Sequence, residues 1–338
     1  MLWHRRNNIL GVRFLGGGPQ MKSVQAGVRT YVPVKVLVVP LATDCQILAS
    51  FRKIALSCLA HLEVNLEGMF NSDDPEFIHQ MRVSARRLRA AIHLFAPRLP
   101  PVFSNELLPP LRQLMDHLGK VRDLDVLLAE IAMPVVQALP DEPRLAALVK
   151  AVTERKHAAR KTALRYFRST SYVRLMLLAT KLLHHPSFVE QAAEETIASF
   201  VTDRVKRLRK EVLELAKAAR TEDPASLHGL RIGIKQLRYA LGFFESLLYS
   251  GKTLRRVLSQ LGALQDDLGQ LNDLANARPL LMHCAHDDTR LRKVVPLVDD
   301  WHNPRRRKLL ARMPRRLEKF QRLHLPTPKP RQVGAIDQ

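Results

Sequence analysis

One sequence element occurs twice in this chain of 338 residues. The copies start at Asp74 and Asp223 and read DPEFIHQMRVSARRLR and DPASLHGLRIGIKQLR, 149 positions apart. Six residues coincide without a gap, namely the Asp, Pro, His, Leu and two of the Arg residues of the first copy. Because a repeat means that one structural unit is used twice, it restricts the fold more than any local pattern does. We therefore predict an internally duplicated domain.

A second pair of blocks supports the duplication. The sequence LRQLMDHLG starts at Leu111 and LGALQDDLG starts at Leu261, and an Asp-Leu pair follows each block at Asp123 and Asp273. These blocks are 150 positions apart, so the connection between the two elements differs by one residue between the copies. Chance similarity is a poor explanation for two matching elements that occur in the same order.

Apolar residues recur every three or four positions through most of the chain, which is the pattern of amphipathic helices. Few segments alternate β-branched and polar residues, so we predict an all-α fold. The helical domain is predicted at residues 44–323, with halves at about 44–188 and 189–323. Residues 1–43 are predicted to form a poorly ordered N-terminal extension, and residues 324–338 a flexible tail that contains prolines.

Several helix boundaries follow from local sequence. Asp74 and Asp223 are expected to accept hydrogen bonds from the first free amides of a helix, and the proline after each has the backbone angle of a first helical residue. Two predicted helices, 105–119 and 253–269, end at a glycine, and the next predicted helices are 121–132 and 271–285. Both repeat elements are thus expected to begin capped helices.

Each copy carries an apolar row and a basic row along the same helix. The apolar rows have the rhythm of a bundle seam and consist of Ile78, Met81, Ala85, Leu88, Ile92 and Phe95, and of Leu227, Leu230, Ile234, Leu237, Leu241 and Phe244. The basic rows, named here the first and second basic stripes, consist of His79, Arg82, Arg86 and Arg89, and of His228, Arg231, Lys235 and Arg238. At about 100° per residue, each stripe covers an arc of about 80° beside its apolar row. We therefore expect the stripes to border a groove between helices.

The charge of the chain indicates an anionic partner. Lys and Arg number 54 against 32 Asp and Glu, a formal net charge of +22, which is far more than solubility requires. A solvated helix face mixes both signs, whereas each basic stripe has one sign and repels itself unless an anion lies along it. Two other interpretations remain: internal carboxylates hold the stripes, or water alone solvates them. For His79 and His228 the alternative to a ligand contact is an ordinary helix interface.

Carboxylates occur near the basic helices in both copies. Such residues usually pair with arginines and orient them, and this is the interpretation favoured for Asp116, Asp123, Asp266 and Asp273. A magnesium site at Asp123 and Asp125 is the alternative, since Mg²⁺ often uses one or two carboxylates together with phosphate oxygens. We predict no metal and no cofactor.

The doubled motif H-x-[ML]-R-[VI]-x-x-[RK]-x-L-R, together with LGKVRDLDV at 118–126, resembles the CHAD family, the conserved histidine α-helical domain. The resemblance runs from about Asp44 to Leu323. It implies two four-helix bundles related by a pseudo-twofold axis, with a basic channel or groove between them. It also implies binding of inorganic polyphosphate by the residues of the two basic stripes, often with localisation to polyphosphate granules.

The favoured function is therefore a polyphosphate-binding module without enzymatic activity. The alternative is a non-specific protein that binds the phosphate backbone of DNA or RNA. Aromatic residues make up only 6% of the chain and none interleaves with the basic stripes, so stacking on nucleic-acid bases is not expected. A phosphate-transfer enzyme is the least favoured, because no glycine-rich phosphate loop or carboxylate cluster is present.

The cysteines and the apolar segments indicate in which cellular compartment the protein is located. The three cysteines form no C-x-x-C pair and are too few for a disulfide framework, which is typical of a reducing compartment. The apolar segment 31–42 is interrupted by Lys35 and two prolines, and it is shorter than the about 20 residues of a membrane-spanning helix. We predict a cytoplasmic protein with no membrane partner.

Overall fold

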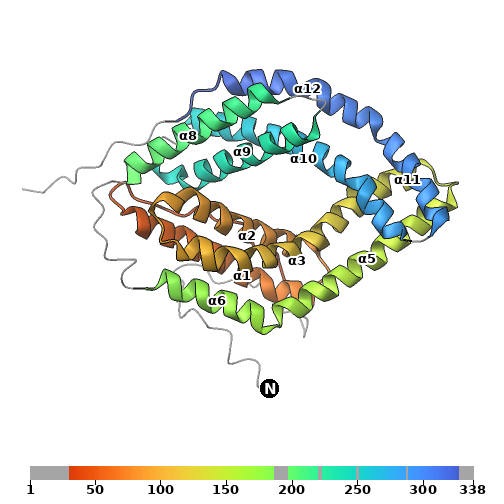
Figure 1. Ribbon diagram of the computed structural model, residues 1–338, viewed down its shortest axis with the longest axis horizontal. Coiled ribbons are helices and arrows are strands. Elements are labelled where there is room, and N and C mark those ends of the chain that lie inside the picture. Colours follow the sequence, from red (N-terminus) through yellow and green to blue (C-terminus); the bar gives the residue numbers. More distant parts are fainter. Residues whose placement is uncertain (1–29, 186–196, 220–222, 249–250, 287, 327–338) are drawn as a thin grey trace, which may run out of the picture.

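The computed structural model describes residues 30–185, 197–219, 223–248, 251–286 and 288–326 (Figure 1). Within these residues every regular element is a helix, which confirms the all-α prediction. None of the helices in these ranges is both long and apolar enough to cross a membrane. The principal helices are α1 (Ile47–Asn71), α2 (Pro75–Phe95), α3 (Leu108–Val126), α4 (Met133–Ala138), α5 (Pro143–Phe167), α6 (Thr170–Leu183), α8 (Ile197–Ala218), α9 (Pro224–Phe243), α10 (Lys252–Ala285), α11 (Thr289–Trp301) and α12 (Asn303–Gln321).

The helices form two groups that face each other across the middle of the molecule. Helices α1, α2, α3 and α6 pack together, and α8, α9, α10 and α12 form the second group (Figure 1). Helix α5 packs on α3 and also on α10 and α11, so it joins the two groups at one end of the molecule. The pseudo-twofold relation between the halves stays a prediction.

The caps and the apolar rows lie where the sequence places them. Asp74 accepts a hydrogen bond from the amide of Glu76 at 2.8 Å, and Asp223 accepts from Ala225 at 3.0 Å and Ser226 at 3.1 Å. All twelve residues of the two apolar rows are buried. Both predictions are therefore confirmed, because the first-turn amides and the apolar rhythm are local properties of the sequence.

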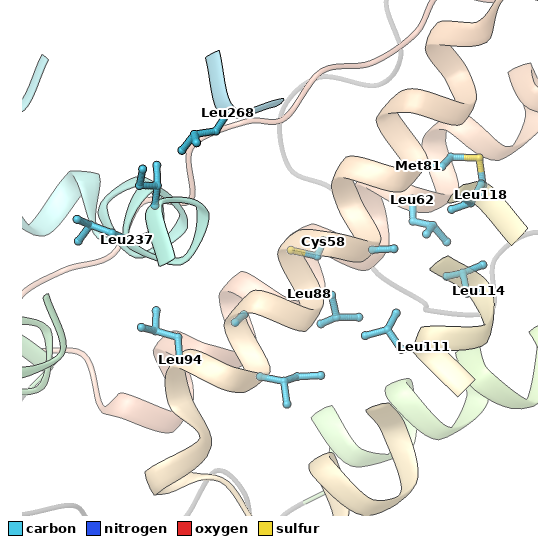
Figure 2. Close-up of a cluster of buried hydrophobic side chains, with 14 of the residues drawn as sticks. Cys58, Leu62, Met81, Leu88, Leu94, Leu111, Leu114, Leu118, Leu237 and Leu268 are labelled. Carbon is cyan, nitrogen blue, oxygen red and sulfur yellow. The ribbon is translucent and has the colours of Figure 1, made fainter. Parts of the chain in front are cut away.

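The core continues from one helix group into the other. Figure 2 shows part of it, in which Met81 of α2 lies beside Leu118 of α3 and Leu88 of α2 beside Leu111 of α3. Phe95 and Phe244, the last residues of the two apolar rows, have ring centroids 5.8 Å apart. This aromatic contact joins the ends of α2 and α9, so both helices carry their basic stripes away from a common junction.

Two predicted helix ends are wrong. Helix α3 continues through Gly119 as far as Val126, and α10 runs without a break through Gly269 to Ala285. A glycine inside a helix costs only about 1 kcal/mol relative to alanine. Burial of the leucines on both sides of each glycine outweighs this cost, because a buried leucine contributes about 1.5–3 kcal/mol.

Part of the predicted N-terminal extension is packed against the domain. The amide of Val34 donates to Oδ1 of the buried Asn65 at 3.0 Å, and Asn65 Nδ2 donates to the Val34 carbonyl at the same distance. Further along, the amide of Leu41 donates to Ser246 Oγ at 2.9 Å. The backbone groups of Val34 and Leu41 are thus held by side chains of the helical domain. The boundary of the extension at residue 43 stays a prediction. Residues 1–29 and 327–338 lie outside the described residues.

Candidate anion-binding groove

The two basic stripes face a common groove between α2, α3, α9 and α10, the four helices at the centre of Figure 1. The groove has a volume of about 980 Å³. Among the residues that the structure describes, seven Lys and Arg side chains line it, against three carboxylates. The lining cations are Arg82, Arg86, Arg89, Arg112, Lys120, Arg231 and Lys235.

Six of the eight stripe residues line this groove, and two do not. His79 and Arg238 are the exceptions. On α9 the lining includes Ile232, Gln236 and Tyr239, which each follow a stripe position by one residue. Helix α9 is therefore turned so that its groove face is displaced from the centre of its stripe, and Arg238 is exposed outside the lining. His79 is half-buried, and its Nδ1 has no hydrogen-bond partner.

Internal acids neutralise little of the stripes. Within the described residues, the ion pair that involves a stripe residue is Arg82 Nη2 to Asp123 Oδ1 at 3.2 Å. The Asp123 side chain is 58% exposed, so an anion that enters from solvent can compete for Arg82. His228 Nδ1 lies 3.3 Å from Oδ1 of Asn272 on α10. Arg86 and Lys235 have no internal carboxylate partner in the described residues.

A glycine gives Arg82 its place beside α3. A Cβ atom on Gly119 would lie 2.7 Å from Nη1 of Arg82, closer than real contacts allow. The absence of a side chain at Gly119 therefore lets the guanidinium lie against the backbone of α3 and reach Asp123. At Gly269, the equivalent position in the second block, no atom lies within 4 Å of an added Cβ.

Burial, together with neighbouring cations, lowers the pKa values of several basic residues at the groove. Burial, with the cations Arg231, Arg86 and Arg82, lowers the pKa of Lys235 to about 7. Burial is also the main cause that lowers the pKa values of Arg82 and Arg231, and burial with nearby arginines lowers that of His79. Each of these shifts disfavours the charged form, mainly because burial removes water from the cation, and an anion bound in the groove would oppose the shift.

The carboxylates divide between the groove and the helix interfaces. Asp116, Asp123 and Asp273 line the groove, whereas the exposed Asp266 does not. Partial burial raises the pKa of Asp123, and Asp273 adds to this, while Arg82 opposes it. Asp125 is buried and forms an ion pair with Lys156 Nζ of α5 at 2.8 Å.

These positions bear on the magnesium alternative. Asp123 lies in the groove and Asp125 in a helix interface, so the two carboxylates do not form one site. The described part of the chain has no group of three His, Cys, Asp or Glu residues arranged to hold a metal ion. Asp123 pairs with Arg82, as the interpretation favoured from the sequence predicts.

Several groove residues were missed by sequence reasoning. Arg112 and Lys120 of α3, His93 of α2 and His283 of α10 line the groove beside the stripes, as does Tyr239 of α9. Only on α3 did the sequence contain a pattern that could have revealed these residues. Its lining residues recur every three or four positions next to the apolar row of Leu111, Leu114 and Leu118, as the basic stripe does on α2.

Comparisons of the sequence and of the structure with known proteins point to the same family. A family model described as the CHAD domain matches residues 53–282. A crystal structure of the CHAD domain from the plant Ricinus communis is 31% identical, covers 89% of this chain and 100% of that chain, and has a TM-score of 0.74. PptA from Streptomyces chartreusis shares the fold at 14% identity, with a TM-score of 0.60 over 81% of this chain and 98% of that chain. A search of curated proteins gives no match. The chain therefore belongs to the CHAD domain family.

Proposed function

We propose that this protein binds inorganic polyphosphate in the groove between α2, α3, α9 and α10, and that it does so as a binding module rather than an enzyme. One observation carries the proposal. Cations from both halves of the chain line a single groove, and most of them form no ion pair with an acid among the described residues. A linear polyanion would supply the missing negative charge along the whole groove and release bound counterions.

The distribution of charge favours polyphosphate over nucleic acid. Arg82 and Arg86 come from one wall of the groove, and Arg231 and Lys235 come from the opposite wall. A polyphosphate chain exposes charged oxygens on every side of its axis, whereas a nucleic-acid strand carries bases on one side. Tyr239 is the one Phe, Tyr or Trp residue among the described lining residues, so a base-stacking platform is absent from this part of the chain.

A competition gel shift tests the proposal directly. Labelled long-chain polyphosphate is bound to the purified full chain at near-physiological salt and challenged with duplex and with single-stranded DNA. We expect polyphosphate to stay bound in the presence of excess DNA phosphate. Competition on equal terms per phosphate would instead support the nucleic-acid alternative. Turnover of polyphosphate in the presence of Mg²⁺ would contradict the non-enzymatic part of the proposal.

The family resemblance extends the proposal to location. Members of this family often associate with polyphosphate granules, and we propose a cytoplasmic location on such granules for this chain. Co-localisation of the tagged full chain with stained granules is the expected result. Uniform distribution in cells that contain granules would contradict it.

The substitution Gly119→Ala is expected to weaken polyphosphate binding without weakening the fold. The new Cβ displaces the Arg82 guanidinium, and we expect a loss of affinity of about three- to tenfold, up to about 1.4 kcal/mol. Thermal stability should stay level or rise, since alanine favours a helix by about 1 kcal/mol over glycine. The matched control is Gly269→Ala, where an added Cβ meets no atom within 4 Å. Equal affinities of the two variants would show that the place of Arg82 is unimportant.

A further inference from the structure

A second basic surface lies outside the groove, on α12. Five cations recur along this helix and at its C-cap, Arg322, at spacings of four, three, four and three residues, and all are exposed: Lys308, Arg312, Arg315, Lys319 and Arg322. We name this row the outer stripe. At about 100° and about 1.5 Å per residue, it occupies an arc of about 80° and extends for about 21 Å.

The outer stripe consists of like charges with almost no internal compensation. Like charges three or four residues apart on a helix destabilise it. Glu318 is the single acid of the 19 residues of α12, and it pairs with Arg322. Lys308, Arg312, Arg315 and Lys319 make no ion pair within the described residues. The row therefore repels itself unless an external anion lies along it.

Other arginines of α12 form ion pairs with neighbouring helices. Arg316 Nε lies 3.0 Å from Oδ2 of the buried Asp267 on α10, and Arg306 pairs with Asp299 at 2.8 Å. Buried apolar residues of α12, Met313 and Phe320 among them, complete the packing. The cations that anchor α12 are thus separate from those that face solvent.

The outer stripe is also separate from the groove. No residue of α12 lines the groove among the described residues. Asp267, the partner of Arg316, lies on a different face of α10 from the groove residues Asp273 and Asn276. Helix α12 lies along the outer edge of its helix group, with α10 between it and the centre of the molecule (Figure 1).

We propose that the outer stripe is a second binding surface for the same phosphate polymer, engaged by the part of a long chain that extends beyond the groove. The inference rests on the proposed function of the groove. A chain held in the groove keeps its free end near the protein, where its effective concentration at the outer stripe is about millimolar. The exposed, single-signed row without aromatic rings fits a flexible chain of charges.

The proposal predicts that the outer stripe matters for long chains and not for short ones. The test variant carries Lys308→Gln, Arg312→Gln, Arg315→Gln and Lys319→Gln. The control variant loses the same charge on α8, through Lys206→Gln, Arg207→Gln, Lys210→Gln and Lys217→Gln, on an exposed face that also carries acids. Affinities for tripolyphosphate, which is short enough to lie within the groove, and for long-chain polyphosphate are measured at several salt concentrations.

For the test variant we expect affinity for long-chain polyphosphate to fall at least about tenfold, and the salt slope to fall by about three, since each contact with a single strand contributes about 0.7. Its affinity for tripolyphosphate should stay within about twofold of the original chain, as should both affinities of the α8 control. Equal losses in the two variants, or equal losses for short and long chains, would overturn the proposal.

Two further results separate this proposal from the function of the groove. If the original chain fails to bind tripolyphosphate and long-chain polyphosphate at all, the proposed function itself fails. If the test variant loses affinity for duplex DNA but keeps its full affinity for long-chain polyphosphate, the outer stripe serves nucleic acid and the inference is wrong. Far-UV circular dichroism checks that both variants keep their helices.

Discussion

Replacing the four central groove cations by glutamine is expected to lower the affinity for polyphosphate at least about a thousandfold. The variant carries Arg82→Gln, Arg86→Gln, Arg231→Gln and Lys235→Gln. Hydrogen bonds to charged groups contribute about 1.5–3 kcal/mol each, so the loss of four exceeds the about 4 kcal/mol that a thousandfold change needs. The preference for polyphosphate over DNA should disappear as well, because it depends on cations from both walls of the groove.

The unliganded form of this variant should be at least as thermally stable as the original chain. Burial and mutual repulsion lower the pKa values of Arg82, Arg231 and Lys235, so these cations destabilise the empty groove. The α8 control removes the same net charge and should retain polyphosphate binding. Isothermal titration calorimetry measures the affinity of each variant for polyphosphate, and thermal melts measure the stability of its unliganded form. Retained binding by the groove variant would contradict the proposed site.

Polyphosphate affinity is expected to fall as the pH rises above 7, through Lys235. Burial and the neighbouring arginines lower the pKa of Lys235 to about 7 in the empty groove, and a bound anion favours the charged form and raises that pKa. Binding then takes up a proton. Affinity is at its full value below the pKa of the free protein and falls by up to about tenfold per pH unit above it, until the pKa of the bound state is passed.

The substitution Lys235→Arg isolates this effect, since arginine stays protonated throughout the range. We expect the pH dependence between about pH 7 and about pH 9 to flatten in this variant while tight binding remains. The pKa values of His79 and His93 are lowered from 6.5, so both rings are neutral in this window. If polyphosphate affinity changes with pH equally in Lys235→Arg and in the original chain, a group other than Lys235 causes the pH dependence.

The local features of the fold were predictable from the sequence because they depend on neighbours along the chain. Asp74 and Asp223 cap their helices through amides two or three residues away. The buried seam of α2 and α9 follows from the three-four rhythm of apolar residues. The two glycine breaks were mispredicted, since burial of the leucines around Gly119 and Gly269 depends on helices distant in sequence.

The candidate site was predictable only in part. Six stripe residues line the groove, whereas Arg238 does not, because the lining face of α9 is displaced from the centre of the stripe. The orientation of a helix is set by all of its packing partners, and a single-helix pattern does not contain it. For the same reason Tyr239 was missed, since it becomes a groove residue only where α9 approaches the centre of the molecule. The lining row of α3, which includes Arg112, did have a signal in the spacing of its residues.

The sequence by itself determined that this chain forms capped amphipathic helices with two single-signed basic rows, because periodicity and charge are properties of consecutive residues. Only the tertiary structure decided that these rows line one groove. Contacts such as Phe95 with Phe244 join residues far apart in the sequence, and they fix the distance and rotation between α2 and α9. Whether two rows of like charge converge or point apart is a property of that packing.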